Sequence, residues 1–294
     1  MSEPVAVSDA TEDDLDDDEE MPAHDLVTSD AALSLEEAGA LAGRRGVTLA
    51  LLLGEVGTGK STLLAELWTE FMIRGDVGQT GFAGSTTALA FEERAYHSRL
   101  KSGRAASAQR RTAENDDGFL HLRAPRDDGA LLELLAADIT GEHFTRIREG
   151  IPLLEELAFA GRADRFAFLV DGAAIADPAQ RENAFNRTRR LIRQLTTSRC
   201  MVATARAALV LTKQDELQGN DIGVYATFET KLLGLLQKLD DEAEAFQVAA
   251  RPRDGSDPRG LEALMAWLTR PDRAVAAPPT LESGSRRAFS RFTA

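Results

Sequence analysis

Glycine, lysine and hydroxyl residues recur at an informative spacing in residues 54–61, which fit the pattern G-x-x-x-x-G-K-[ST]. In such a loop the glycines let successive backbone N–H groups turn toward phosphates, and the positive end of the following helix faces the same anion. The lysine reaches the outer phosphates and the serine hydroxyl binds Mg²⁺. The pattern predicts a nucleoside triphosphate site without separating ATP from GTP. We expect contacts from Gly54, Glu55, Val56, Gly57, Thr58, Gly59, Lys60, Ser61 and Thr62.

A second motif, Asp138-Ile139-Thr140-Gly141, follows an apolar stretch that ends at Ala137. An aspartate at the end of a strand can hold Mg²⁺ through a water molecule, and the N–H of the later glycine can approach the terminal phosphate. The pattern D-x-x-G is common in turns, so its weight comes from its position after the strand. We expect Asp138 at the metal and Gly141 at the phosphate.

A third motif, Thr212-Lys213-Gln214-Asp215, follows the apolar stretch 207–211. A carboxylate here can accept hydrogen bonds from the N1 and N2 donors of guanine, while a lysine stem stacks along the base. Adenine lacks that donor pair, so Asp215 would reject ATP because its charge would stay unpaired. The backbone N–H of Ala250, in Ala249-Ala250-Arg251, is expected at the guanine carbonyl.

One alternative comes from residues 166–171, an apolar run that ends in Asp171. This arrangement also fits a P-loop ATPase in which Asp171 is the metal-holding aspartate. In a guanine-nucleotide protein the same residues are the next strand of the sheet, with a structural aspartate at its end. The motif 212–215 favours guanine.

Short apolar runs alternate with amphipathic helical patterns from Gly46 onward, as in a sheet with helices on both faces. We expect strands at 47–53, 166–170, 207–211 and 246–250, and an antiparallel edge hairpin of 119–123 with 131–137. Helices are expected at 60–74, 151–160, 178–195, 223–239 and 261–268, with a short helix after the N-cap Ser34. Residues 75–114 read as irregular. The fold class is α/β, a P-loop NTPase three-layer sandwich with a mostly parallel six-stranded sheet.

The net charge of −14 is confined to the N-terminal part of the 294-residue chain, because residues 1–43 hold fourteen acidic residues and no Lys or Arg. We therefore expect an acidic, largely disordered arm at 1–43, one GTPase domain at 44–270 and a flexible tail at 271–294. Neither a basic stripe with aromatics nor a long apolar run is present, so nucleic-acid and membrane binding are not expected. The single cysteine, Cys200, agrees with a reducing, cytoplasmic location.

With these motifs in this order, the chain resembles a TRAFAC-class GTPase domain over roughly residues 46–270. The segment 81–94, which reads GFAGSTTALAFEER, further resembles bacterial double-GTPase domains of systems proposed to act in defence or conflict. The resemblance implies GTP or GDP with Mg²⁺ as cofactors. It also implies a switch threonine, Thr86 or the favoured Thr87, that ligates Mg²⁺ together with Ser61 and Asp138. The catalytic residues it implies are Lys60, Thr87, Gly141 and Glu142.

Two departures from that family pattern bear on turnover. Glu142 stands where many such GTPases place a glutamine or histidine that orients water, and its charge would repel the terminal phosphate. Hydrolysis should then be slow, unless His143 takes over the role. The base-reading element also reads Ala249-Ala250-Arg251 instead of S-A-K. A non-hydrolysing, nucleotide-dependent scaffold therefore stays open as a second function.

Five arginines, Arg94, Arg99, Arg104, Arg110 and Arg111, lie in or near the first switch region. One of them could stabilise the separating phosphate as an arginine finger, although most residues of this kind are solvated loop charges or partner contacts. The resemblance implies protein partners that contact the switch regions, among them a second GTPase-like protein or effector. It also leaves open a nucleotide-dependent dimer.

Overall fold

A six-stranded sheet forms the centre of the protein, for which a computed structural model describes residues 31–44, 46–102, 117–126, 129–152, 156–199 and 201–271. The strand order is β4-β5-β1-β6-β7-β8, and every neighbouring pair is parallel except β4 with β5. The predicted fold class, including the antiparallel edge hairpin, is confirmed. The six strands are β1 (Val47–Leu53), β4 (Gly118–Pro125), β5 (Leu131–Asp138), β6 (Arg165–Asp171), β7 (Arg206–Thr212) and β8 (Glu244–Gln247).

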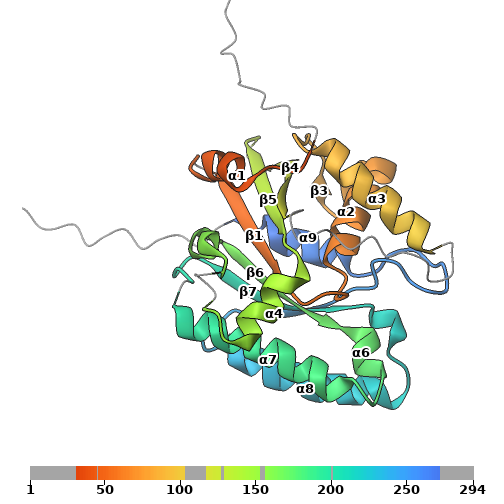
Figure 1. Cartoon of the computed structure of the whole chain (residues 1–294). Helices are drawn as coiled ribbons and strands as arrows, with labels where there is room; N and C mark the ends of the chain where they lie inside the picture. Colours follow the sequence, from red (N-terminus) through yellow and green to blue (C-terminus); the bar gives the residue numbers. More distant parts are fainter. Residues whose placement is uncertain are drawn as a thin grey trace, which may run out of the picture.

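Helices cover both faces of this sheet, which gives three layers (Figure 1). Alternation along β1 shows the division, because Leu49 and Leu51 pack in one core and Ala50 and Leu52 in the other. The first core is closed by α1 (Leu35–Ala42), α4 (Gly141–Glu149), η1 (Ala158–Arg162), α6 (Gly172–Ala176), α7 (Arg181–Ser198) and α8 (Asn220–Leu236). The second is closed by α2 (Lys60–Arg74), α3 (Ala88–Ser102) and α9 (Leu261–Thr269).

The short helix expected after Ser34 is present as α1. The Ser34 hydroxyl accepts a hydrogen bond from the Glu37 N–H, and the Glu37 carboxylate accepts one from the Ser34 N–H, which completes a capping box. Leu33 is fully buried and exchanges backbone hydrogen bonds with Phe119 of β4. Residues 31–43, which the sequence assigned to the acidic arm, therefore pack against the domain. Residues 1–30, 272–294 and Cys200 lie outside the described residues.

The stretch 75–114, predicted to be irregular, contains the long helix α3 and the small hairpin of β2 (Asp76–Val77) with β3 (Thr80–Gly81). The helix packs on α2, where the ring of Phe91 stacks on Trp68 at 4.9 Å. Its apolar face is narrow, with Ala90, Phe91 and Ala95 buried between charged residues. Such a face gives little helical periodicity. The prediction was wrong for this reason.

The structure also has a helix that the sequence did not predict, α4 (Gly141–Glu149), just before the predicted helix 151–160. Within that predicted span, Glu156 is helical. Only Phe144 and Ile147 of α4 are buried large side chains, and the helix ends at Gly150, whose φ is +123°. Of the predicted span, residues 158–160 lie in the 3₁₀ turn η1 and residues 153–155 lie outside the described residues. Across the described part of the chain, no helix is both long enough and apolar enough to span a membrane.

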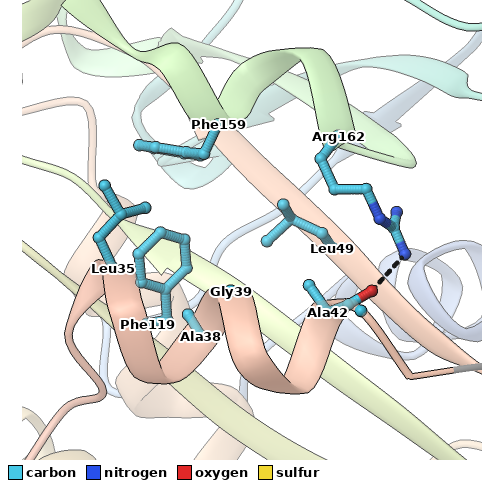
Figure 2. Close-up of a pocket in the computed structure, with 9 residues that line it drawn as sticks. Leu35, Ala38, Gly39, Ala42, Leu49, Phe119, Phe159 and Arg162 are labelled. Atoms are coloured by element: carbon cyan, nitrogen blue, oxygen red, sulfur yellow. Dashed lines mark hydrogen bonds between the residues drawn. The ribbon is translucent and has the colours of Figure 1, made fainter.

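An apolar cavity of about 230 Å³ lies between α1, β1, β4 and η1 (Figure 2). The rings of Phe119 and Phe159 line it, and at one end the Arg162 guanidinium donates a hydrogen bond to the Ala42 carbonyl at 3.0 Å. Gly39 of α1 also lines this cavity, and a Cβ atom added there would meet nothing within 4 Å. A helical glycine thus stands beside unfilled apolar space.

We predict that Gly39→Ala raises the free energy of unfolding by about 0.5–1 kcal/mol, because alanine loses less backbone entropy in a helix. Gly46→Ala is the matched control. A Cβ at Gly46 also meets nothing within 4 Å, but its φ is +87°, so this substitution should cost about 1–2 kcal/mol. Urea unfolding of both variants measures the difference. Two changes of the same sign would contradict the prediction.

Candidate nucleotide-binding site

The phosphate-binding loop, residues 54–61, connects β1 to α2 and depends on glycines at three places. Gly57 and Gly59 have φ of +84° and +90°, which L-residues adopt only with strain. At Gly54 there is no room for a side chain, because a Cβ there would lie 2.6 Å from the Thr58 hydroxyl oxygen. The Thr58 hydroxyl in turn donates to the Glu55 carbonyl at 2.9 Å. The loop is thus wound as a phosphate cradle requires.

Lys60 is buried inside this loop. Its ammonium group donates to the Gly54 carbonyl and, at 3.2 Å, to the Glu55 carbonyl, and it lies 5.2 Å from the centre of the Phe144 ring. Burial lowers the pKa of Lys60 to about 8, against the opposing effect of nearby carboxylates, first Asp138 and then Glu142. The lysine is therefore a poorly solvated cation directed at the centre of the loop.

Asp138 lies beside Ser61, as the sequence predicts for a metal-holding pair. β5 is the parallel neighbour of β1, so its carboxyl end reaches the beginning of α2. The Ser61 hydroxyl donates to one Asp138 oxygen at 3.1 Å, and Arg94 of α3 donates to the other at 2.6 Å. Sequence reasoning included Arg94 only among five candidate arginines. The side chain of Arg99 is not described, and Arg104, Arg110 and Arg111 lie outside the described residues.

Gly141 approaches the phosphate-binding loop so closely that no other residue fits. A Cβ at Gly141 would lie 2.6 Å from the Cα of Val56. The turn before it is held by Asp117, whose carboxylate accepts the Thr140 N–H at 2.7 Å. The beginning of α4 therefore lies against the loop, where the sequence predicts that Gly141 approaches the terminal phosphate.

The motif 212–215 meets the same loop from the other side. The Thr212 hydroxyl donates to the Thr58 carbonyl at 2.8 Å, and the Lys213 ammonium donates to the Gly57 carbonyl at 2.8 Å. Lys213 has a φ of +50°, an unusual backbone conformation for a residue with a side chain. Because its ammonium group reaches the Gly57 carbonyl, the aliphatic part of the Lys213 side chain lies beside the loop, as expected for stacking along a base.

Asp215 lies at the edge of this site. One of its carboxylate oxygens accepts the backbone N–H of Arg253 at 2.9 Å. The β8 end comes close as well, because the Gln214 N–H donates to the Val248 carbonyl at 3.1 Å and Ala249 forms a β-bridge with Arg259. Ala250 follows this bridge directly. The structure thus brings the segments of Asp215 and Ala250 together.

Asp171, the aspartate of the ATPase alternative, has other partners. It caps α6 by accepting the Ala173 N–H at 3.0 Å and accepts the Lys213 ammonium at 2.9 Å. The Ser61 hydroxyl instead contacts Asp138. The contacts of Asp171 are those of a structural aspartate that positions Lys213.

Thr86 and Thr87 contact the sheet rather than the loop. The fully buried Thr87 hydroxyl accepts the His121 N–H at 2.9 Å, and the Thr86 N–H donates to the His121 ring at 3.1 Å. Among the hydrogen bonds of the described residues, none joins either threonine to Ser61 or Asp138. Burial lowers the pKa of His121 to about 4, so its neutral ring can accept these bonds.

His143 and Glu142 differ in their surroundings. Both ring nitrogens of His143 face carboxylates, those of Asp117 and Glu156, which anchors the ring at the beginning of α4. In this structure both ring nitrogens are thus engaged by carboxylates, and a role of His143 in orienting the attacking water stays a prediction. Glu142 lies in the first turn of α4, and its charge acts on Lys60.

Sequence reasoning missed two arginines that fix the loop. The nearly buried Glu55 pairs with Arg148 of α4 at 3.2 Å and with Arg187 of α7 at 3.1 Å. A buried carboxylate within a phosphate site needs such partners. No local sequence signal relates either arginine to residue 55, because both pairs are long-range.

The oxygen ligands at the end of β5 and the beginning of α2 suit Mg²⁺, a cation that prefers oxygen ligands and keeps several water molecules. The Ser61 hydroxyl and the Asp138 carboxylate are such ligands, and they lie 3.1 Å apart. Within the described ranges, no cluster of three or more His, Cys, Asp or Glu side chains could hold a metal alone. This set fits a metal that takes its remaining ligands from phosphates and water.

Comparison with solved structures gives two examples of low similarity. A bacterial selenocysteine-specific elongation factor, EF-Sec, matches at 19% identity and a TM-score of 0.37, over 74% of this chain and 27% of that one. The chain thus spans about a quarter of that factor's length. A signal recognition particle receptor complex, SRb-GTP/SRX from Chaetomium thermophilum, matches at 15% identity and a TM-score of 0.43, over 77% of this chain and 99% of that one.

No curated protein matches the chain in sequence. A model of the Double-GTPase 2 domain matches residues 50–268, well over half of the chain and all the strands of the sheet except the beginning of β1. The matched span includes the phosphate-binding loop and the motifs 138–141 and 212–215. The chain therefore belongs to the Double-GTPase 2 family and is a GTP-binding P-loop protein.

Proposed function

We propose that this protein hydrolyses GTP slowly with the help of Mg²⁺ in the cytoplasm, and that it signals through nucleotide-dependent switch segments. One observation carries the proposal: the three motifs share direct contacts around one loop. Ser61 contacts Asp138, and Thr212 and Lys213 donate to the carbonyls of Thr58 and Gly57. The TRAFAC-class assignment supports the same function and stays a prediction.

In this proposal the chain binds the phosphates with the loop backbone and Lys60. Lys60 exchanges the carbonyl oxygens of Gly54 and Glu55 for phosphate oxygens, which raises its pKa again because the new partners are anionic. Ser61 and a switch threonine would hold Mg²⁺, with Asp138 in its outer shell. The metal, when bound, supplies positive charge to the phosphate oxygens.

The position and charge of Glu142 are an argument for slow hydrolysis. Its charge acts on Lys60 and would oppose the negative terminal phosphate. Since both ring nitrogens of His143 contact Asp117 and Glu156, the ring must leave these carboxylates before it replaces a water-orienting glutamine. The same observation favours the second candidate function, a scaffold that binds GTP without turnover.

The switch segments are the part of the proposal that concerns partners. Thr87 contacts β4 in this structure, so its binding to Mg²⁺ requires the hydrogen bond to the His121 N–H to break. Gly141 lies against the loop and would lose a contact when the terminal phosphate leaves. The partners proposed are a second GTPase-like protein or an effector, or a second copy of the chain in a nucleotide-dependent dimer.

Phosphate release from GTP should be slow in the wild type but faster than in Lys60→Ala, which lacks the cation at the loop centre. Lys231→Ala, an exposed change on α8, is the control and should match the wild type. Purified proteins are compared at equal concentration with Mg²⁺. Equal rates for wild type and Lys60→Ala would support the scaffold instead.

Guanine selection should depend on Asp215. Asp215→Asn is expected to lower GTP affinity by about tenfold or more without improving ATP binding, because a charged hydrogen-bond acceptor is lost. Asp254→Asn serves as a matched change in the neighbouring loop, where the Asp254 carboxylate accepts a hydrogen bond from the Ser256 N–H at 3.0 Å. Nucleotide titration measures all three proteins. A wild type that prefers ATP, or an unchanged Asp215→Asn, would rule out guanine recognition.

GTP affinity should also fall at alkaline pH. The pKa of Lys60 is lowered to about 8 in the nucleotide-free protein, and binding favours the protonated lysine. The affinity is therefore constant well below pH 8 and falls by up to about tenfold per pH unit above it. Lys60→Arg keeps its charge throughout, so its profile should lack the fall caused by Lys60 and show only the titration of the nucleotide. Equal pH profiles in the two proteins would contradict this role of Lys60.

A further inference from the structure

Arg94 joins α3 to the metal-holding carboxylate. Its Nε donates to one Asp138 oxygen at 2.6 Å, and its Nη1 donates to the Ala90 carbonyl one turn earlier at 3.0 Å. The Arg94 side chain is 16% exposed and that of Asp138 only 3%. Arg94 therefore forms a largely buried ion pair with Asp138, whereas the sequence favoured a solvated loop charge at this position.

The same carboxylate is the expected outer-shell partner of Mg²⁺. A divalent cation near Asp138 repels the Arg94 guanidinium and competes with it for the carboxylate charge. Arg94 then needs another anion, because a poorly solvated guanidinium without a partner is costly. The anion that arrives together with the metal is the triphosphate.

We propose that Arg94 is a phosphate-pairing residue: it neutralises Asp138 until Mg²⁺ binds, and then pairs with the terminal phosphate of GTP. This inference rests on the proposed function. The planar guanidinium presents several N–H donors that match phosphate oxygens, and it stays charged at any physiological pH. GDP has no terminal γ-phosphate, so Arg94 contributes to the binding of GTP and not of GDP.

The surroundings of Arg94 make its movement observable. Trp68 of α2 packs on α3 one turn before Arg94, with its ring stacked on Phe91 at 4.9 Å and 6° and its Nε1–H donated to Glu92 at 2.7 Å. Thr87 directly precedes α3, and its carbonyl accepts the Phe91 N–H in the first turn of that helix. A shift of Arg94 toward the phosphate therefore changes the environment of Trp68.

The test compares GTP with GDP in Arg94→Gln. Trp267→Phe is introduced into every protein, since the chain has two tryptophans and Trp267, a residue of α9, is buried in the core on the same face of the sheet as Trp68. Arg74→Gln is the matched control, an arginine of α2 that pairs with Glu70 at 3.0 Å away from the loop. Dissociation constants for Mg²⁺ with GTP and with GDP are measured, together with Trp68 fluorescence.

Arg94→Gln should lose about tenfold in GTP affinity, as expected for one charged hydrogen bond to the terminal phosphate, while GDP affinity stays the same or rises because no terminal phosphate pairs with Arg94 in the GDP complex. The GTP-specific change in Trp68 fluorescence should disappear, whereas Arg74→Gln keeps both properties. An equal loss for GTP and GDP, or an unchanged ratio of their affinities, would overturn the inference.

If Arg94→Gln does not fold by circular dichroism, Arg94→Lys keeps the charge and loses the planar donor set. It should reduce GTP affinity a few-fold and leave GDP affinity unchanged, and an unchanged ratio would again overturn the inference. Wild-type protein that binds neither GTP nor GDP would instead overturn the proposed function itself. If only the inference about Arg94 is wrong, the wild-type protein still binds both GTP and GDP normally.

Discussion

The backbone of the phosphate-binding loop is clamped between the ends of two strands, and the rest of the site depends on this clamp. From the β5 side, the Cα of Gly141 comes so close to Val56 that only hydrogen fits between them. From the β7 side, the Thr212 hydroxyl donates a hydrogen bond to the Thr58 carbonyl and the Lys213 ammonium donates one to the Gly57 carbonyl. Because those peptide planes are fixed before any ligand binds, the loop is preorganised for an anion.

Burial of charge explains why distant helices hold this loop. Glu55, Lys60 and Asp138 are each less than a tenth exposed, and each would be costly without partners. Arg148 and Arg187 compensate Glu55, while Arg94 compensates Asp138. Since these arginines come from α4, α7 and α3, the electrostatic balance of the loop is coupled to the position of three helices. A change in charge at the loop therefore alters the ion pairs that hold α3, α4 and α7 against it.

The sheet and the three motifs could be predicted because their signals are local. Short apolar runs such as β1 and β7 are recognisable without their neighbours, and fixed glycine and lysine spacings describe the loop itself. The narrow apolar face of α3 gave little such periodicity, and α4 is a helix of only 9 residues with two large buried side chains, which leaves a short pattern to recognise. The pairs of Arg94 with Asp138 and of Arg148 with Glu55 had no signal at all, because a long-range ion pair leaves no pattern in one sequence.

The helical state of α3 changes how the first switch should be understood. The sequence suggested a long irregular stretch, residues 75–114, that contains the switch threonine. In the structure, Thr87 immediately precedes α3, which carries Arg94 two turns later, and Phe91 between them is stacked on Trp68. A helix transmits displacement along its length because its backbone hydrogen bonds resist local bending. The contacts of Thr87 with β4 and of Arg94 with Asp138 are therefore made from one continuous helical segment, which is packed on α2 between them.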